Sequence, residues 1–265
     1  MITPILMLGA GNMGGAMLDG WRKAKAFAPA DLMILDPKPG EAALRAQKAG
    51  ARINPPADEM ASARTIILSV KPQIWREAAA QYGSTLAPDA VIVSVAAGVK
   101  ARDISEAFGG RAVARVMPTT AVAIGQGTAS IHASDPAAAA VARALFEPLG
   151  AVVELADEEQ LHAATGVSGS APAYLYAFVE ALEGAGQAAG LAPADAARLA
   201  RSTITGAAAL LAHSKAEPAD LRRQVTSPGG TTEAALNVLL GANGLPILLR
   251  EAVGKAVRRS KELGG

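Results

Sequence analysis

The chain contains no cysteine among its 265 residues. Disulfide bonds, thiolate nucleophiles and metal or iron–sulfur sites held by cysteine are therefore excluded. Histidine is also rare, and His132, His162 and His213 lie too far apart along the chain to form a metal-ligand pattern. We therefore expect no metal site.

Aromatic residues make up only 3% of the chain, although hydrophobic residues make up 51%. Alanine and glycine supply much of the bulk, and small residues let helices approach closely, so we expect dense helix packing rather than aromatic clusters. An excess of one charge sign is missing as well, since Lys+Arg number 25 and Asp+Glu number 24. This balance argues against nucleic acid or an acidic membrane surface as a partner.

No apolar run free of glycine and charge is long enough to span a membrane. The segment Met1–Pro4 has no basic residue ahead of the first apolar run, and a glycine-rich turn follows at once, so we expect no signal peptide. We therefore expect a cytoplasmic protein without membrane attachment, with room for two domains in 265 residues.

The N-terminal half opens with the pattern of a dinucleotide-binding fold. A short apolar run at 5–8 predicts a buried parallel strand, followed by a G-x-G-x-x-G turn, a helix and a second strand that ends at Asp36. Gly9 makes the tight turn in this pattern, Gly11 admits the pyrophosphate to the backbone, and Gly14 lets the helix pack on the strand. The candidate cofactor residues of the turn are Gly9, Ala10, Gly11, Asn12, Met13 and Gly14.

Asp36 and Lys38 bear on the choice of nicotinamide cofactor. A carboxylate at Asp36 would accept hydrogen bonds from the adenosine ribose 2′-OH and repel a 2′-phosphate, which favours NADH. Lys38 could instead meet a 2′-phosphate, although it also fits a solvated turn, and Lys71 lies in another loop of the same face. The residues therefore favour NADH slightly and leave NADPH open.

The alternation of strand and helix continues to about residue 157, with further strands expected at 65–70, 91–95, 112–117, 127–131 and 152–155 and a helix at 136–146. Ligands of a doubly wound sheet bind beyond the carboxyl ends of its strands, so the loops at 69–72, 96–98 and 118–120 should face the cofactor. The candidates in these loops are Ser69, Val70, Lys71, Pro72, Ala96 and Ala97. We expect an α/β domain with a Rossmann-type doubly wound sheet of about eight strands.

Strand patterns stop after about residue 157, and the rest of the chain reads as helices separated by glycine and proline. The helix at 173–189 is apolar nearly all round, which is typical of a helix buried on every side. The remaining helices cannot cover it within one copy, so we predict that this all-α domain packs against its twin in a homodimer. The expected domains are 1–157 for dinucleotide binding and 158–265 for dimerisation and substrate binding. Further helical patterns lie at 193–212, 218–225, 231–240 and 246–263.

The segment Thr226–Thr232, with sequence TSPGGTT, predicts a tight loop that opens a helix. Free N–H groups at such a helix start attract an anion such as a carboxylate. The hydroxyls of Ser227, Thr231 and Thr232 add hydrogen-bond donors. An ordinary capped turn between two helices explains the same residues.

In several segments, taken in order, the chain resembles pyrroline-5-carboxylate reductase. They are GAGNMG at 9–14, VKPQ at 70–73, AAG at 96–98, GVSGSAPAY at 166–174 and TSPGGTT at 226–232. The resemblance runs over nearly the whole chain, and the last block is its most specific part. It implies reduction of Δ1-pyrroline-5-carboxylate to L-proline, the last step of proline biosynthesis, with NADPH or NADH. It also implies an interlocked homodimer of the helical domain and, in many members, higher oligomers built from dimers.

The resemblance also implies roles for single residues. Thr232 would be the catalytic residue, its hydroxyl bound to the ring nitrogen and helping to deliver a proton. Ser227 and the backbone of Gly230, Thr231 and Thr232 would hold the substrate carboxylate. The family commonly has Met-Pro-Asn-Thr-Pro where this chain has MPTTA at 117–121, so the contacts of that loop and the range of substrates stay open.

Two other interpretations stay open. One is a different reductase on the same architecture, for another cyclic imine or for a hydroxyacid. The β-hydroxyacid dehydrogenases use a lysine and an asparagine about a turn apart on the helix corresponding to 173–189, and this chain has neither there. The other is a non-catalytic NAD(P)-binding protein, against which the intact block at 226–232 is the main argument.

Overall fold

The computed structural model describes residues 2–264, so the outermost residues of the two expected domains, 1 and 265, lie outside the described residues. The chain forms two compact units. The first runs up to Gly169 and includes the residues from Ala256 onward, and the second is Ser170–Lys255. The units reflect contacts alone, so the functional division between residues 157 and 158 remains a prediction.

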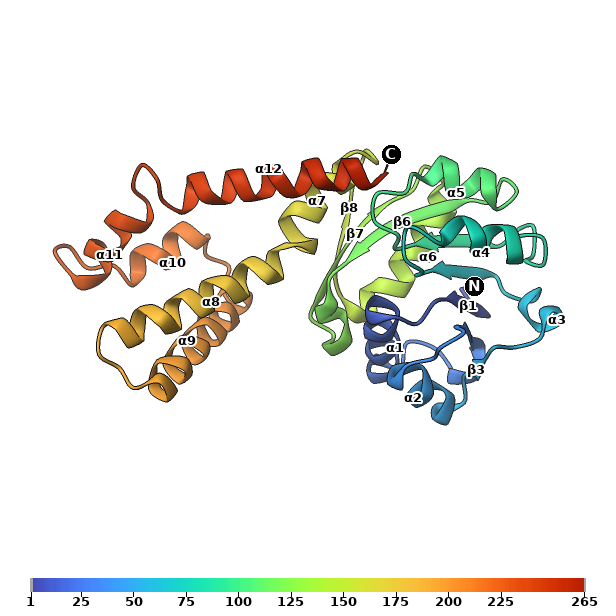
Figure 1. The fold of residues 1–265 in the computed structure, drawn as a ribbon, viewed down its shortest axis with the longest axis horizontal. Coiled ribbons are helices and arrows are strands. Elements are labelled where there is room, and N and C mark those ends of the chain that lie inside the picture. Colours follow the sequence, from blue (N-terminus) through green and yellow to red (C-terminus); the bar gives the residue numbers. More distant parts are fainter. Residues whose placement is uncertain (1, 265) are drawn as a thin grey trace. The chain divides into compact units, whose positions relative to one another are not determined.

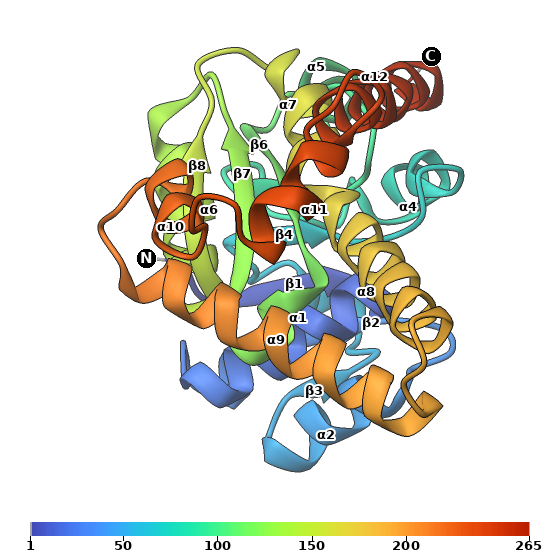
Figure 2. The same cartoon turned by 90° about the vertical axis from the view of Figure 1, so that its left-hand side faces the viewer.

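The first unit is built on one eight-stranded sheet with the order β3-β2-β1-β4-β5-β6-β7-β8 (Figures 1 and 2). Neighbouring strands are parallel except β6 and β7, which are antiparallel. The strands are β1 (Ile5–Leu8), β2 (Leu32–Leu35), β3 (Arg52–Ile53), β4 (Thr65–Leu68), β5 (Val91–Ser94), β6 (Val113–Pro118), β7 (Gly127–His132) and β8 (Gly150–Glu154). This topology confirms the predicted Rossmann-type sheet.

Helices cover both faces of the sheet. They are α1 (Asn12–Ala24), α2 (Glu41–Ala49), α3 (Ala57–Met60), α4 (Trp75–Tyr82), α5 (Ala101–Ala107), α6 (Pro136–Phe146) and α7 (Gln160–Ala164). Side chains alternate across a strand, so Ile5 and Met7 of β1 pack with α1, α2 and α6, whereas Leu6 and Leu8 pack with α3, α4 and α5. The two hydrophobic cores hold the carboxyl ends of the central strands in a fixed row.

The second unit is helical, as expected. Its helices are α8 (Ala171–Ala188), α9 (Pro193–His213), α10 (Pro218–Gln224), α11 (Thr231–Leu239) and α12 (Leu245–Gly264). Helices α8 and α9 form a hairpin and pack against each other (Figure 1). The end of α12 belongs to the first unit, where Ser260 makes a buried hydrogen bond of 2.9 Å with His162 of α7. Among the described residues, no helix combines the length and apolar character needed to cross a membrane.

In a single chain the helix at 173–189 is left uncovered, as expected from the prediction that one copy cannot cover it. No residue of α8 is buried, and Tyr176 and Leu175 are 67% and 45% exposed. The physical reason is that α9, its packing partner in this unit, covers only one side of α8. Exposed apolar surfaces of this kind are typical of interaction sites.

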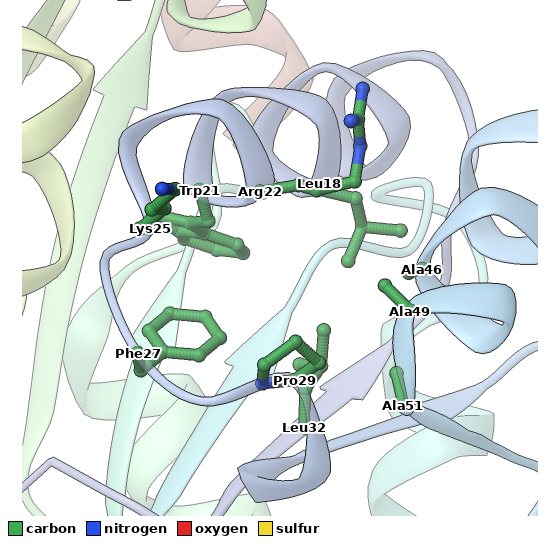
Figure 3. Close-up of a pocket in the computed structure, with 10 residues that line it drawn as sticks. All are labelled: Leu18, Trp21, Arg22, Lys25, Phe27, Pro29, Leu32, Ala46, Ala49 and Ala51. Atoms are coloured by element: carbon green, nitrogen blue, oxygen red, sulfur yellow. The ribbon is translucent and has the colours of Figure 1, made fainter.

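A cavity of about 260 Å³ lies in the first unit at the amino-terminal end of β2 (Figure 3). Large side chains of α1 and β2 face small ones of α2 across it, and it is lined by Leu18, Trp21, Arg22, Lys25, Phe27, Pro29, Leu32, Ala46, Ala49 and Ala51. Three of these are alanines, so the gap follows from the alanine-rich composition. It lies at the opposite edge of the sheet from the glycine-rich turn.

Candidate active site

The glycine-rich turn has the geometry that a pyrophosphate group requires. Gly9 has a positive φ of 88°, and a Cβ there would lie 3.0 Å from the Ser69 carbonyl oxygen. A Cβ on Gly14 would lie 2.7 Å from the Gly9 oxygen, so α1 sits directly against the turn. In contrast, a Cβ on Gly11 would meet nothing within 4 Å. The open side of Gly11, beside the unpaired first-turn N–H groups of α1, fits a bound phosphate.

Asp36 lies at the end of β2, and hydrogen bonds hold its carboxylate against this turn. The amide of Ala10 donates to Oδ2 at 2.7 Å, and the amide of Lys38 donates to Oδ1 at 2.8 Å. The structure therefore brings together Asp36 and the glycine-rich turn, as the sequence predicted. The side chain of Lys38 is exposed.

Sequence reasoning missed Asn54, which follows β3 and braces Asp36. Its side chain accepts a hydrogen bond from the Asp36 amide at 2.9 Å and donates one to the Asp36 carbonyl oxygen at 3.0 Å. Asn54 has a positive φ of 50°, a conformation that asparagine adopts more readily than most residues. An asparagine just before two prolines was the available signal, but β3 is so short that nothing in the pattern placed it beside β2.

Ser69 and Val70 follow β4 and shape the same edge of the sheet. The Ser69 hydroxyl lies within hydrogen-bond distance of the carbonyl oxygens of Leu8, at 3.1 Å, and of Gly9. It can donate to only one of them at a time, and either bond supports the turn. Lys71 is exposed, and its carbonyl oxygen accepts a hydrogen bond from the Ile74 amide in the turn that leads into α4. Ser69 therefore stabilises the glycine-rich turn through a hydrogen bond.

A second cavity, of about 210 Å³, opens between the ends of β1 and β2 and helix α4. Mostly apolar side chains line it, and they are Leu8, Gly9, Leu35, Pro37, Val70, Ile74, Glu77, Ala78, Gln81 and Tyr82. Cavities of about 150 Å³ accept a benzene ring, so this one can hold a flat heteroaromatic ring. The α4 residues were missed because they come from a helix face, not from a strand end.

The loop after β5 carries Ala96 and Ala97, and an ion pair between buried Arg115 and half-buried Glu158 supports the residues that follow it. Glu158 accepts hydrogen bonds from the Ala101 amide at 2.7 Å and from Arg115 at 2.9 Å, and Arg115 is only 4% exposed. Burial opposes ionisation of Glu158, but these two hydrogen bonds outweigh it and hold its pKa below the usual value. The start of α5, just after the loop, is therefore anchored to β6.

The loop after β6 differs in sequence from the family that this chain resembles. In the structure, Thr119 of this loop makes local hydrogen bonds. Its hydroxyl accepts a hydrogen bond from the Thr128 amide at 3.0 Å, and its own amide donates to the Thr128 carbonyl oxygen at 2.9 Å. Thr119 thus closes the hairpin between β6 and β7, ahead of a 3-10 turn over Thr120–Ile124. Its side chain is buried in that role and does not extend into the loop.

The Gly-Val-Ser-Gly segment forms a π-helical turn, η4 (Thr165–Gly169), rather than a simple break. Hydroxyls of Thr165 and Ser168 donate to carbonyl oxygens one turn back, at 2.7 and 2.8 Å. A Cβ on Gly169 would lie 3.6 Å from Met117, so the turn passes close to the carboxyl end of β6. π-Turns of this kind occur often at functional sites.

In the second unit, Gly230 is the N-cap of α11, and the preceding loop is exposed. Gly229 has a positive φ of 69°, and its amide donates to the Glu233 carboxylate at 2.8 Å. The Gly230 amide donates to the Ser227 carbonyl oxygen at 3.0 Å, and a Cβ on Gly230 would lie 2.6 Å from the Ser227 hydroxyl. The amides of Thr231 and Thr232 belong to the first turn, whose N–H groups have no acceptor within the helix.

The chain matches a family model for pyrroline-5-carboxylate reductase dimerisation over residues 158–263. Residues 4–98 match a model described as NADP oxidoreductase, coenzyme F420-dependent. The chain is 38% identical to pyrroline-5-carboxylate reductase of Pseudomonas aeruginosa, over 99% of this chain and 98% of that protein. It is 36% identical to the Synechocystis enzyme of the same name, over 97% of each. A solved pyrroline-5-carboxylate reductase from Coxiella burnetii superposes with a TM-score of 0.91 at 28% identity, covering 100% of both chains.

Proposed function

Because the chain belongs to the pyrroline-5-carboxylate reductase family of NAD(P)-dependent oxidoreductases, we propose that it reduces Δ1-pyrroline-5-carboxylate to L-proline with NADPH or NADH. This reaction is the last step of proline biosynthesis. The observation that carries the proposal is 38% identity over 99% of the chain, which includes both the glycine-rich turn and the TSPGGTT loop.

We assign cofactor binding to the first unit, whose residues fit a dinucleotide. The first-turn amides of α1 would bind the pyrophosphate, Asp36 would accept from the adenosine ribose, and the cavity beside α4 would take the adenine ring. Ala96 and Ala97 leave room for a ribose or ring close to the backbone after β5. When bound, the reduced nicotinamide supplies a hydride to the carbon of the C=N bond.

We assign the substrate carboxylate to the loop before α11. The Ser227 hydroxyl and the amides of Thr231 and Thr232 are donors at the positive end of the helix dipole. The Gly230 amide is already bonded to the Ser227 carbonyl oxygen, so its expected share in the site has less support than that of the two threonines. The Glu233 carboxylate keeps the Gly229 amide occupied and so preserves the shape of the loop.

We propose that Thr232 assists the delivery of a proton to the ring nitrogen of the substrate. Hydride adds to the ring carbon, the C=N π bond becomes the lone pair of nitrogen, and nitrogen takes one proton to give the secondary amine. A hydroxyl is a weak acid, so its part is to orient the ring nitrogen and relay a proton that water supplies. The family resemblance is the support for this role, together with the place of Thr232 in the first turn of α11.

The match to a dimerisation domain supports a homodimer, and the exposed apolar side chains of α8 and α9 agree with it. We propose that these helices pack against those of a second copy. We also propose that residues 1–157 and 158–265 act as the cofactor domain and the dimerisation and substrate domain. Assembly of dimers into higher oligomers and a cytoplasmic location are further parts of the proposal.

The test is oxidation of NADH and NADPH, followed by absorbance, with Δ1-pyrroline-5-carboxylate as substrate. A piperidine-type cyclic imine carboxylate and a 2-keto acid serve as parallel substrates. We expect turnover of the five-membered imine and little with the others. Preference for the larger ring would indicate a different reductase of the same fold. Clear cofactor binding without turnover of any imine would contradict the proposal and favour a non-catalytic NAD(P)-binding protein.

A further inference from the structure

We propose that the cavity at the amino-terminal end of β2 binds a small aromatic carboxylate. This cavity of about 260 Å³ is enclosed by the C-terminal half of α1, by α2 and by the segment that leads into β2 (Figure 3). It shares no lining residue with the cavity assigned to the adenine ring. The inference is therefore separate from the proposed reaction, in which this end of the sheet has no part.

The floor of the cavity is apolar and buried, whereas its rim is open to solvent. Leu18, Trp21 and Leu32 of the floor are at most 4% exposed, and Pro29 and Ala49 of the rim are exposed. An apolar cavity of about 150 Å³ stays dry and accepts benzene. The larger cavity here therefore has room for two fused rings, with a path by which they can enter.

The aromatic wall of the cavity is in place before a ligand arrives. The indole N–H of Trp21 donates to the Leu145 carbonyl oxygen at 2.7 Å, which fixes the plane of the ring. The ring of Phe27 lies 5.6 Å from that of Trp21, at an angle of 50°. Ala46 and Ala49 face these rings from α2 across the cavity (Figure 3). Aromatic rings attract one another beyond the effect of burial alone, so a flat ring fits this space better than an aliphatic chain does.

Contacts between α1 and α2 keep the cavity from closing. Arg45 of α2 donates two hydrogen bonds to the Asp19 carboxylate of α1, at 2.6 and 3.1 Å. Nearer the start of both helices, a Cβ on Gly15 would lie 3.3 Å from the Ala42 side chain, so the helices already touch there. Since the two walls cannot move closer together, the space between them persists, and a ligand that fills it recovers the lost packing contacts.

The charged residues of the rim favour an anion. Arg22 and Lys25 are the charged side chains among the lining residues, and both are positive. Asp19 lies 3.5 Å from Arg22, but it pairs more closely, at 2.6 Å, with Arg45. A carboxylate attached to a ring in the floor would therefore lie near uncompensated positive charge, whereas an amine in the same place would be repelled.

The test titrates the full-length protein with indole-3-acetate and with tryptamine, which share a ring system and carry opposite charges. Calorimetry gives the two Kd values. We expect indole-3-acetate to bind at one site with a Kd of about 0.1 mM, and tryptamine to bind at least about tenfold more weakly. Saturating NADH should leave both values unchanged. Displacement of indole-3-acetate by NADH would place the ring in the cofactor site and overturn the inference.

Two substitutions locate the site. Ala46→Leu fills the cavity and should weaken binding of indole-3-acetate at least about tenfold, and Ala49→Leu at the exposed rim is the alternative if Ala46→Leu does not fold. Ala24→Leu, at an exposed position of α1 that does not line the cavity, is the matched control and should leave the Kd unchanged.

Lys25→Gln tests the charge of the rim. It should weaken binding of indole-3-acetate several-fold and strengthen that of tryptamine, with little change in the melting temperature. Absence of binding to the unchanged protein, equal affinities for the two probes, or undiminished binding in a folded Ala46→Leu or Ala49→Leu variant would each overturn the inference. None of these measurements uses an imine, so their outcome does not depend on the proposed reaction.

Discussion

The two units bury their apolar side chains to very different degrees. In the first, strand residues such as Ile5, Met7 and Ile67 are fully buried between two layers of helices. In the second, the buried hydrophobic residues are Ala196 and Ala200 of α9, while leucines, a tyrosine and a phenylalanine are exposed on the same pair of helices. The first unit completes its core within one chain, and the second requires a further surface, which agrees with its match to a dimerisation domain.

We expect the largest effect from a substitution in the exposed apolar surface of the second unit. Leu175→Asp puts a carboxylate on the exposed face of α8, and burying that charge in an interface costs several kcal/mol. We expect the dissociation constant of the dimer to rise by at least about 100-fold, and we expect most of the activity to be lost. Light scattering at micromolar concentration measures the mass.

Leu44→Asp is the matched control, because Leu44 on α2 is 44% exposed and Leu175 is 45% exposed. Leu44 belongs to the unit that completes its own core, so this variant should keep the mass and activity of the unchanged protein. A Leu175→Asp protein that is still a dimer would show that α8 does not form the interface.

A second experiment separates chemistry in the second unit from cofactor binding in the first. Thr232→Ala removes the hydroxyl proposed to bind the ring nitrogen. We expect kcat/KM to fall by an amount that corresponds to a loss of about 2–4 kcal/mol of transition-state stabilisation, the range for one oriented donor. The Kd for NADH should not change. Thr232→Ser keeps the hydroxyl and should retain most of the activity, and unaltered kinetics in Thr232→Ala would eliminate the catalytic role.

A third experiment measures how much the partly buried Arg115–Glu158 ion pair contributes to the stability of the first unit. The folded-state pKa of Glu158 lies below 4.5, so its bond to Arg115 stabilises fully above that pH and is lost as the pH falls through the folded value. We expect Glu158→Gln to lower the free energy of unfolding by about 1–2 kcal/mol at neutral pH and by less near pH 3. Urea unfolding at the two pH values measures this.

The control for this pair is Glu154→Gln. Glu154 pairs with Arg143, but both side chains are more than 40% exposed, at 43% and 47%. An exposed pair of this kind contributes about 1 kcal/mol or less. Equal losses in the two variants would mean that burial does not strengthen the Arg115–Glu158 pair.

The smallest effect concerns the packing defect of the first unit. Ala46 faces the cavity in Figure 3, so Ala46→Leu should fill part of it and raise the free energy of unfolding by about 1 kcal/mol. Ala42, one turn earlier on α2, has no such space, because a Cβ on Gly15 would already lie 3.3 Å from it. Ala42→Leu should therefore destabilise the protein. Destabilisation by both variants in urea unfolding would show that the cavity cannot take a larger side chain.

The predicted helices and strands agree with the structure to within a few residues where the pattern is local. The expected helix at 136–146 is α6, which Asp135 caps through the amides of Ala137 and Ala138. The strand β3 was missed, because its two residues, Arg52 and Ile53, form no periodic pattern and are ordered by pairing with β2. Short elements of this kind depend on neighbours that are distant in the sequence.

In the candidate site, too, the features that depend on local sequence were predicted, and those that depend on distant segments were not. Gly9, Gly11 and Gly14 were assigned distinct places in the turn, and the structure gives each of them that geometry because backbone conformation and close approach depend on the residue type itself. The place of Asp36 beside the turn also followed from its spacing. The brace by Asn54 and the cavity against α4 did not, because they join segments whose distance in space is set by the order of strands in the sheet.

The order of residues was sufficient for the fold class, the cofactor class and the family, because each depends on patterns within a few turns of chain. The apolar character of α8 and its lack of cover within one chain were predicted, but which of its faces α9 contacts was decided by the tertiary structure. Likewise, an aspartate in the sequence indicates a ribose ligand, but the folded chain holds its carboxylate with two amides and its backbone with an asparagine. The position of the Asp36 carboxylate is therefore fixed by contacts between segments that are distant in the sequence.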